Sequence, residues 1–383
     1  MRVTLVEPSG LYAYHSSNRY AFNVAQAGEA SGRFVATRLP APLLPAGRFA
    51  RRPWRRDATW TPGNGAPDVV HFAMAGVAHH AARFDAPSVA THHDLLRVVQ
   101  LPQRLPSPLT NARWREVGQL AKWLDRGRAG RAIANLLAAD HIIAVSQTMA
   151  DELCQRYPAA RGRVSVVPNV VGAHIQPYSD AEAWLQQRGI HLPDGPKVLM
   201  VGTSNDYKNI PLALRAMALP ELRRATLVRV GRALRPEQAA LARTLGGAIV
   251  HLGSLDDESL ARVYCACDVL IQPSLWEGFG IPVIEAFAAG TPVVSSDGGA
   301  LPEVAGDAGL VVSGTATAAP APGRLAAFAA SVALLLRDSA LRGNLRERGL
   351  ARAERFRPAA VGPLLADAYE RAVAARRARF GPQ

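Results

Sequence analysis

Two glutamates flank a glycine-containing loop in the segment Glu277-Gly-Phe-Gly-Ile-Pro-Val-Ile-Glu285. The apolar run before it (268–273) predicts a buried strand. Pro282 suits the first turn of a helix, because its fixed φ fits there and its missing N–H needs no partner. The N–H groups near Gly280 and Ile281 are therefore expected at a helix N-terminus. Unpaired donors and the helix dipole make such a terminus an anion site.

This segment has a second interpretation, a strand, loop and helix with two surface glutamates, and the pattern alone leaves both open. The spacing also does not decide whether Glu285 faces the same cavity as Glu277.

Another segment, VGTSNDYKN (201–209), again predicts a strand, a loop of small residues and the start of a helix. Its Lys208 is one of only three lysines among the 44 Lys and Arg residues. A solvated lysine at a helix start opposes the dipole, which favours a cation facing a diphosphate.

The elements that must position these loops follow an alternating pattern. Short β-branched runs alternate with helical patterns, which is typical of βαβ units and parallel sheets. The predicted strands are 3–7, 69–73, 88–92, 141–145 and 164–168, then 197–202, 225–231, 248–253, 268–273 and 292–296. The predicted helices are 16–30, 116–138, 147–156, 180–188, 209–218, 236–245, 257–266 and 282–289, with more helix within 323–377. The Pro-rich segment 41–54 is predicted to be a loop.

The length of 383 residues predicts two domains. Pro, Gly and Asp gather at 170–195, where we place the boundary. We expect an α/β protein with two doubly wound, Rossmann-like domains, 1–180 and 190–358, facing a central cleft. Ligands bind at the carboxyl ends of such sheets. Residues 359–383 are predicted to form a final helix that packs back on the first domain.

Composition excludes several classes of protein. Hydrophobic residues make up 49% and charged residues 20%, which excludes a disordered chain. Cys154, Cys265 and Cys267 form no disulfide framework and have no zinc-site spacing, so a reducing compartment is expected. The apolar run before Glu7 is too short for a signal peptide, and no apolar stretch reaches ~18 residues. We therefore expect a cytoplasmic protein.

The stretch from Gly202 to Val312 resembles the donor-binding domain of family-4 retaining glycosyltransferases of the GT-B fold (glycosyl transferases group 1). The motifs are VGTSNDYKN followed by HLGSLDDESLARVYCACDVLIQPSLWEGFGIPVIEAFAAGTPVVSSDGGALPEVAGDAGLVV. The first half matches more loosely, through VEPSG, THHDL, IIAVSQTMADEL and VSVVPNV. The resemblance implies transfer of a hexose from a nucleotide-diphosphate sugar to a glycan or lipid-linked acceptor in surface polysaccharide biosynthesis. GDP-mannose is the first donor expected, followed by UDP-hexoses.

The resemblance also implies roles for individual residues. Glu277 contacts the donor sugar on its reacting face, and Lys208 neutralises the departing diphosphate. His93, at the end of a first-domain strand, orients the sugar. Backbone N–H groups of the loop hold the distal phosphate, and Glu285 accepts hydrogen bonds from the ribose. The full donor-binding set is Gly10, Thr203, Lys208, Leu255, Gly278, Phe279, Gly280, Ile281 and Glu285.

No cofactor and no divalent metal are expected. The family works without a metal, because the helix terminus and the lysine supply the positive charge. Asp256 and Asp257 are adjacent and are predicted to form a helix N-cap region rather than a metal site. The pairs His79-His80 and His92-His93 are poor chelates, because adjacent side chains point apart.

The sequence departs from the family pattern at two loops. Many relatives carry an arginine beside the lysine or five residues before it, where this chain has Tyr207 and Thr203. Arg232 is a weak substitute. The first loop has a lone Gly10 instead of paired glycines, so an unusual acceptor pocket is expected. Tyr12, Tyr14 and His15 either line that pocket or pack on the domain as ordinary loop residues.

The net charge of +13 mostly reflects a bias towards arginine. One cluster combines five arginines with aromatic residues in segment 47–60, which fits either an anionic membrane surface or a solvated loop. Nucleic-acid binding is not expected, because no binding module accompanies the charge. The arginines of this cluster are Arg48, Arg51, Arg52, Arg55 and Arg56.

Two other functions remain open from the sequence. A nucleotide-sugar 2-epimerase uses the same diphosphate cleft without an acceptor. A non-catalytic donor-binding subunit of a polysaccharide synthase is disfavoured by the presence of both glutamates and the lysine, but the missing arginine keeps it open.

Overall fold

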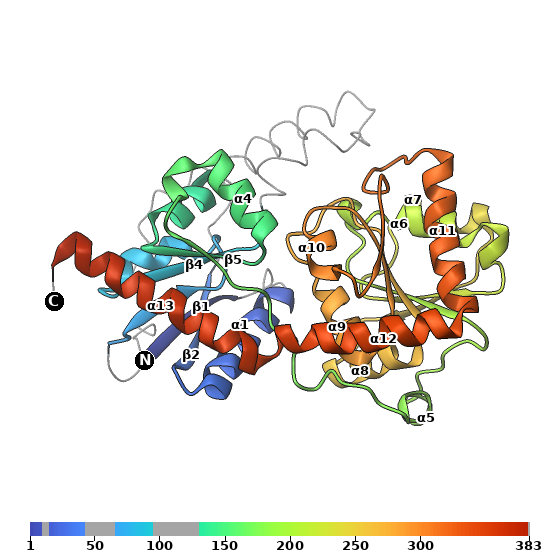
Figure 1. Ribbon diagram of the computed structural model, residues 1–383, viewed down its shortest axis with the longest axis horizontal. Coiled ribbons are helices and arrows are strands. Elements are labelled where there is room, and N and C mark those ends of the chain that lie inside the picture. The colour runs from blue at the N-terminus through green and yellow to red at the C-terminus, as the bar shows by residue number, and fades with distance from the viewer. Residues whose placement is uncertain (10–14, 43–65, 95–129, 382–383) are drawn as a thin grey trace. The chain divides into compact units, whose positions relative to one another are not determined.

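The computed structural model describes residues 1–9, 15–42, 66–94 and 130–381. These residues belong to two compact units (Figure 1). Unit 1 consists of Met1–Val170 and Pro358–Gln383, and unit 2 of Val171–Arg357. The chain therefore leaves unit 1 once and returns to it with its last helix.

Residues 171–180, which the sequence interpretation assigned to the first domain, group with unit 2. The Val171 N–H donates to the Phe356 carbonyl. The guanidinium of Arg357 donates to the carbonyls of Gly172 and Ile175. These bonds tie the two ends of unit 2 together, so the division follows Val170.

Unit 1 is built on a six-stranded sheet with the order β2-β1-β3-β4-β5-β6, and its strand pairs are parallel. The predicted strands all form, with ends shifted by at most two residues. The described strands are β1 (Arg2–Ser9), β2 (Val35–Pro42), β3 (Val69–Phe72), β4 (Ser88–His92), β5 (His141–Ala144) and β6 (Val164–Val166). The described helices are α1 (His15–Ser31), α4 (Gln147–Arg156) and α13 (Pro358–Phe380), with 3₁₀-helices η2 (Ala78–Arg83) and η4 (Pro158–Ala160). Of the predicted helix 116–138, residues 130–138 are helical and the rest lies outside the described residues.

Strand β2 is absent from the sequence prediction, which placed the start of a loop at residue 41. The segment contains Pro40 and Pro42, which argue against a strand inside a sheet. The structure accommodates them because β2 lies at the edge of the sheet and pairs only with β1. The loop prediction is therefore wrong for residues 41–42, and residues 43–54 lie outside the described part of the chain.

Helices α1 and α13 cover one face of the unit 1 sheet. Their apolar side chains, such as Val24 and Leu365, join one buried cluster with strand residues. The two helices approach closely at Gly362, where a Cβ atom would lie 2.3 Å from the carbonyl oxygen of Ala27. Arg33 adds exposed ion pairs to α13. The last helix is thus an integral part of the unit 1 core.

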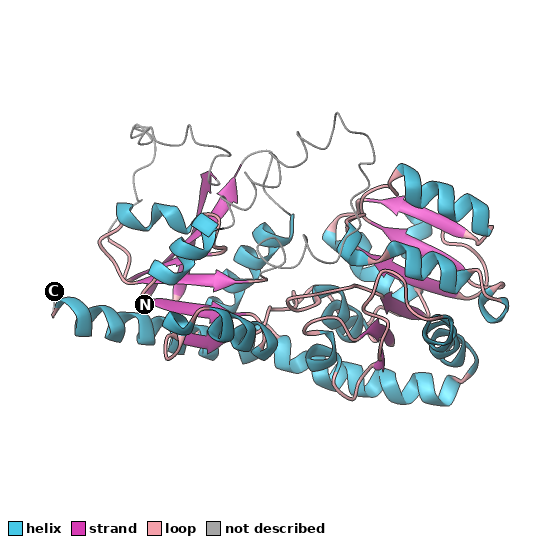
Figure 2. Ribbon diagram, turned by 90° about the horizontal axis from the view of Figure 1, so that it is seen from above, coloured by secondary structure: helices cyan, strands magenta, loops and turns pink. Residues whose placement is uncertain are grey.

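Unit 2 contains a second six-stranded parallel sheet, with the order β12-β11-β10-β7-β8-β9. Helices lie on both sides of its strands (Figure 2). The strands are β7 (Lys197–Val201), β8 (Thr226–Val230), β9 (Ile249–Gly253), β10 (Val269–Gln272), β11 (Val293–Ser296) and β12 (Leu310–Val312). The α-helices are α5 (Ala181–Gln187), α6 (Ile210–Met217), α7 (Pro236–Leu245), α8 (Asp257–Ala266), α9 (Ile281–Ala289), α10 (Leu301–Ala305), α11 (Pro322–Arg337) and α12 (Ser339–Ala353). The 3₁₀-helices are η5 (Asp206–Lys208), η6 (Pro220–Leu222) and η7 (Glu354–Phe356).

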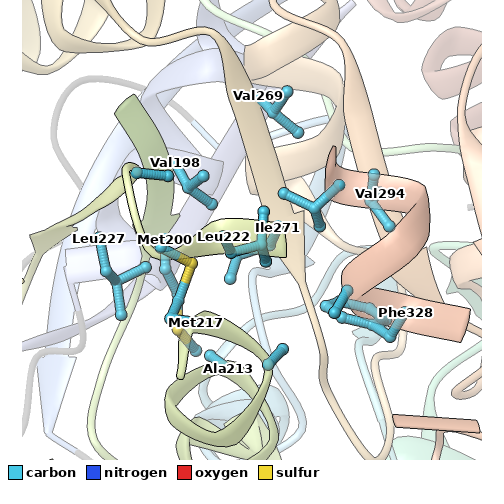
Figure 3. Packing of buried hydrophobic residues seen from close by; sticks show 14 of the residues in the cluster. Val198, Met200, Ala213, Met217, Leu222, Leu227, Val269, Ile271, Val294 and Phe328 are labelled. Atoms are coloured by element: carbon cyan, nitrogen blue, oxygen red, sulfur yellow. The ribbon is translucent and has the colours of Figure 1, made fainter. Parts of the chain in front are cut away.

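The core of unit 2 is continuous between the sheet and helices α6 and α11. Figure 3 shows Met200 and Ile271 of the sheet packed with Met217 of α6 and Phe328 of α11. Buried parallel strands are apolar on both faces, which explains the uninterrupted apolar runs in the sequence. No helix in the described part of the chain is long and apolar enough to cross a membrane.

Burial makes the stability of unit 1 depend on pH. His92, the last residue of β4, is buried, and its Nε2 has no hydrogen-bond partner among the described residues. This burial, helped by the charge of His93, lowers the pKa of His92 to about 3. An unfolded histidine titrates near ~6.5. The unfolded chain therefore takes up the proton first, and stability present above about pH 6.5 is lost as the pH falls towards 3.

We expect His92→Phe, which removes this titration, to weaken the loss of unit 1 stability on acidification by up to about 1.4 kcal/mol per pH unit. Hydrogen exchange of the β4 amides between pH 7 and 5, corrected for intrinsic exchange, measures this slope. His251→Phe is the control, because His251 is exposed and lies in unit 2. An unchanged slope in His92→Phe would contradict the prediction.

Candidate functional site

Lys208 and Glu277 form an ion pair at the carboxyl ends of two adjacent strands of unit 2. The Lys208 Nζ lies 2.7 Å from the Glu277 Oε1, and the side chains are only 9% and 11% exposed. Lys208 ends η5, which follows β7, and Glu277 lies in the loop after β10. Since β7 and β10 are neighbours in the sheet, the topology joins residues that are far apart in the sequence.

Two further donors fix the same oxygen of Glu277. The Gln272 side-chain N–H lies 2.7 Å from Oε1 and the Ser274 hydroxyl 2.6 Å from it. Among the described residues, Oε2 has no hydrogen-bond partner. One oxygen of the Glu277 carboxylate is therefore held by three donors. The sequence prediction did not single out Gln272, whose only signal is an amide at the end of an apolar strand.

The loop after β11 packs against the backbone of Glu277. The Ala300 N–H donates to the Glu277 carbonyl at 2.9 Å. Gly299 has a φ of +62°, and a Cβ there would lie 2.3 Å from the same carbonyl oxygen. A Cβ at Gly298 would lie 2.6 Å from the Ser274 carbonyl oxygen. The two glycines thus allow the loops after β10 and β11 to pack backbone against backbone.

Helix α9 begins as predicted, with Gly280 as its N-cap and Pro282 in its first turn. Gly280 has a φ of +104°, which favours glycine. No side chain caps the helix. The Phe279 ring is buried and packs edge-on against Phe356, with centroids 5.6 Å apart. Phosphate binding by the loop of Gly278, Phe279, Gly280 and Ile281 stays a prediction.

Glu285 is anchored to a neighbouring helix. Its side chain is buried, and the Oε2 accepts a hydrogen bond of 2.8 Å from the Tyr264 hydroxyl of α8. Its role at a ribose stays a prediction. Leu255 follows β9 and is half-buried. Thr203 follows β7, and its hydroxyl is buried without a hydrogen-bond partner among the described residues.

His93 lies in unit 1, directly after β4. Its Nε2 is 2.8 Å from the Ala73 carbonyl, which can only accept, so this nitrogen carries the proton. Burial lowers the pKa of His93, so the ring is neutral near pH 7 and its Nδ1 keeps a lone pair. Tyr20 packs edge-on against the ring with centroids 4.9 Å apart. The orienting role of His93 stays a prediction.

Several predicted residues lie outside the described part of the chain. These are Gly10, Tyr12 and Tyr14 of the first loop and the arginine cluster Arg48, Arg51, Arg52, Arg55 and Arg56. His15 begins α1, and the structure describes only its backbone. Among the described residues, no group of three or more His, Cys, Asp or Glu side chains could hold a metal ion.

Each unit contains a parallel six-stranded sheet whose strand-end loops carry charged residues. Two such Rossmann-like domains define the GT-B fold. Solved structures share this fold. Sucrose-phosphate synthase from Thermosynechococcus elongatus matches with a TM-score of 0.69 and 22% identity, over 98% of this chain and 100% of that chain. Anabaena Alr3699/HepE in complex with UDP-glucose matches with a TM-score of 0.68 and 17% identity, over 96% and 98%.

Sequence comparison identifies the family. Residues 166–352 match the family model of glycosyl transferases group 1, and residues 10–173 match that of glycosyltransferase family 4. The chain therefore belongs to the glycosyltransferase family that these models describe.

Two curated relatives illustrate the range of this family. The D-inositol 3-phosphate glycosyltransferase 2 of Catenulispora acidiphila is 35% identical over 251 residues, covering 62% of this chain and 57% of the relative. O-antigen chain mannosyltransferase B of Escherichia coli is 31% identical, covering 58% of each chain. The matches thus span little more than half the length of these relatives.

The glycine at position 299 provides a test of the support behind Glu277. Gly299→Ala is expected to lower the stability of unit 2 by about 1–3 kcal/mol, because a Cβ is strained at positive φ and meets the Glu277 carbonyl. Gly343→Ala is the control, since Gly343 lies within α12 and its Cβ would meet nothing within 4 Å. That change should stabilise by about 0.5–1 kcal/mol. Urea unfolding measures both effects. A shift of the unfolding midpoint in the same direction for both variants would contradict this role of Gly299.

Proposed function

We propose that this protein is a retaining, metal-independent glycosyltransferase. It would move a hexose from a nucleoside diphosphate sugar to a glycan or lipid-linked acceptor in surface polysaccharide biosynthesis. The observation that carries the proposal is the buried Lys208–Glu277 pair between η5 and the loop that leads into α9. Membership of the glycosyltransferase family supports it.

The transfer reaction creates a charge problem at this site. Breaking the bond between the sugar C1 and the phosphate oxygen leaves an oxocarbenium-like sugar and adds negative charge to the diphosphate. An ammonium group has three N–H donors, so Lys208 can keep its bond to Glu277 and still donate to a phosphate. The first turn of α9 adds the positive end of a helix dipole. Fixed donors aimed at developing charge are an effective means of catalysis.

Glu277 acts on the sugar in this proposal. An ionised carboxylate only accepts hydrogen bonds, and Oε1 is already held by three donors. Oε2 would therefore receive a hydroxyl of the donor sugar and fix its orientation. The acceptor oxygen then bonds to C1 on the face that the phosphate leaves, and its proton passes to the departing phosphate oxygen. His93, with a free lone pair on Nδ1, would accept from another sugar hydroxyl.

GDP-mannose is the first donor proposed, with UDP-hexoses next. Relatives named as mannosyltransferases support the first, and the neighbour in complex with UDP-glucose supports the second. Thermal-shift measurements with GDP- and UDP-sugars test this, because a ligand at 100 times its Kd stabilises the folded state by about 2.7 kcal/mol. No shift with any of these nucleotide sugars would contradict the proposal.

Lys208→Met tests the catalytic role of the cation. Loss of a fixed donor at developing charge typically lowers turnover about 100- to 1000-fold, and we expect a loss of this size in transfer from the preferred donor. Lys197→Met is the matched control. Lys197 is the first residue of β7, and Lys208 lies beyond the other end of this strand. The double variant Lys208→Met/Glu277→Gln, which leaves no unpaired charge, checks by its melting temperature that any loss is not unfolding. Full turnover by Lys208→Met would refute the assignment.

A further inference from the structure

Arg229 is a fully buried arginine in strand β8. It lies opposite Met200 in the register between β7 and β8 and has 0% exposure. Its Nη2 donates to three groups that follow β7 or β8: the Ser204 hydroxyl at 2.9 Å and the Gly202 carbonyl at 3.3 Å after β7, and the Arg232 carbonyl at 3.2 Å after β8. The guanidinium thus lies directly against the loop 202–204.

The charge of Arg229 is not compensated by any carboxylate among the described residues. Its Nε and Nη1 are buried and have no hydrogen-bond partner there. Burial lowers the pKa of Arg229 only to about 10, so the side chain is charged near pH 7. A buried charge without a counter-ion is unfavourable, because no opposite charge offsets the loss of its hydration. Such a cation is well suited to a site that an anion enters.

The loop beside Arg229 is the segment that leads to Lys208. A Cβ on Gly202 would lie 3.3 Å from the Cε of Lys208, so the lysine side chain passes over this glycine while Arg229 holds its carbonyl. The two cations therefore flank the same loop. The residue between these contacts is Thr203, the position at which the family resemblance of the sequence leads one to expect an arginine.

The bond to Gly202 also orients the loop. In a planar trans peptide the carbonyl and the next N–H point in opposite directions. Because the Gly202 carbonyl points towards Arg229, the Thr203 N–H points away from it. Arg229 therefore fixes the direction of a backbone donor in the loop as well as placing a positive charge behind it.

We propose that Arg229 supplies, from beneath the loop 202–204, the positive charge for the donor diphosphate that Thr203 cannot provide. It is a positioning residue, since it acts through the loop. The inference rests on the proposed function, because it requires a diphosphate ligand.

A purely structural role is the alternative to distinguish. Ser204 is also held by Gln238, whose side-chain N–H donates to the Ser204 carbonyl at 3.1 Å. If Arg229 only supported this network, its loss would weaken every ligand of unit 2 equally. If its charge serves the diphosphate, its loss would weaken diphosphate binding and spare the nucleoside.

The experiment compares the wild-type protein with Arg229→Met, Arg229→Lys and the control Arg224→Met, which removes an exposed arginine just before β8, at the end of this strand away from the loop 202–204. Calorimetry measures binding of GDP or UDP, and competition measures the matching nucleoside. We expect Arg229→Met to lose diphosphate affinity on the order of tenfold with nucleoside affinity unchanged. Arg229→Lys, which keeps the charge, should bind diphosphate within about threefold of the wild type, and Arg224→Met should bind like the wild type.

Wild-type diphosphate affinity in Arg229→Met, or an equal loss for diphosphate and nucleoside, would overturn the inference while leaving the proposed function intact. Absence of nucleoside diphosphate binding by the wild-type protein would overturn both. If Arg229→Met does not fold, Arg229→Lys decides: retained diphosphate affinity supports the inference, and equal loss for both ligands overturns it.

Discussion

The hydrogen-bonded contact between Lys208 and Glu277 sets the requirements for the loops around it. Both side chains are largely removed from water, and a buried ion pair is tolerated only when further hydrogen bonds satisfy it. Gln272 and Ser274 provide these bonds, which fixes where β10 must end and how its loop must turn. This loop conformation also requires glycine at position 299, because the Cβ of any other residue would clash with the Glu277 carbonyl.

Most of the secondary structure could be predicted from the sequence because parallel strands buried on both faces are continuous apolar runs. The helix ends at Asp256 and Gly290 follow local rules of capping and glycine conformation. Strand β2 could not be predicted, because its two prolines are acceptable only at a sheet edge. The order of strands in a sheet is a property of the whole fold and not of the segment.

The site likewise contains residues that could be predicted from the sequence and residues that could not. The loop after β10 and the lysine after β7 could be recognised, since their spacing along the chain carries the chemistry. The Glu285–Tyr264 bond and the three contacts of Arg229 could not, because they join different elements that meet only in the folded unit. A lone polar residue in an apolar run, as at positions 229 and 272, is the only trace that such contacts leave in a sequence.

The return of α13 to unit 1 has a consequence for synthesis of the protein. Val361, Leu365 and Tyr369 belong to the same buried cluster as Val3 and Leu5 of the first strand. On the ribosome, where chains emerge from the N-terminus onwards, one face of the unit 1 sheet stays only partly covered, by α1, until α13 has left the exit tunnel. Unit 2, which is continuous in the chain, can complete its core earlier. The sheet of unit 1 is therefore translated before unit 2, but the core of unit 1 is completed after that of unit 2.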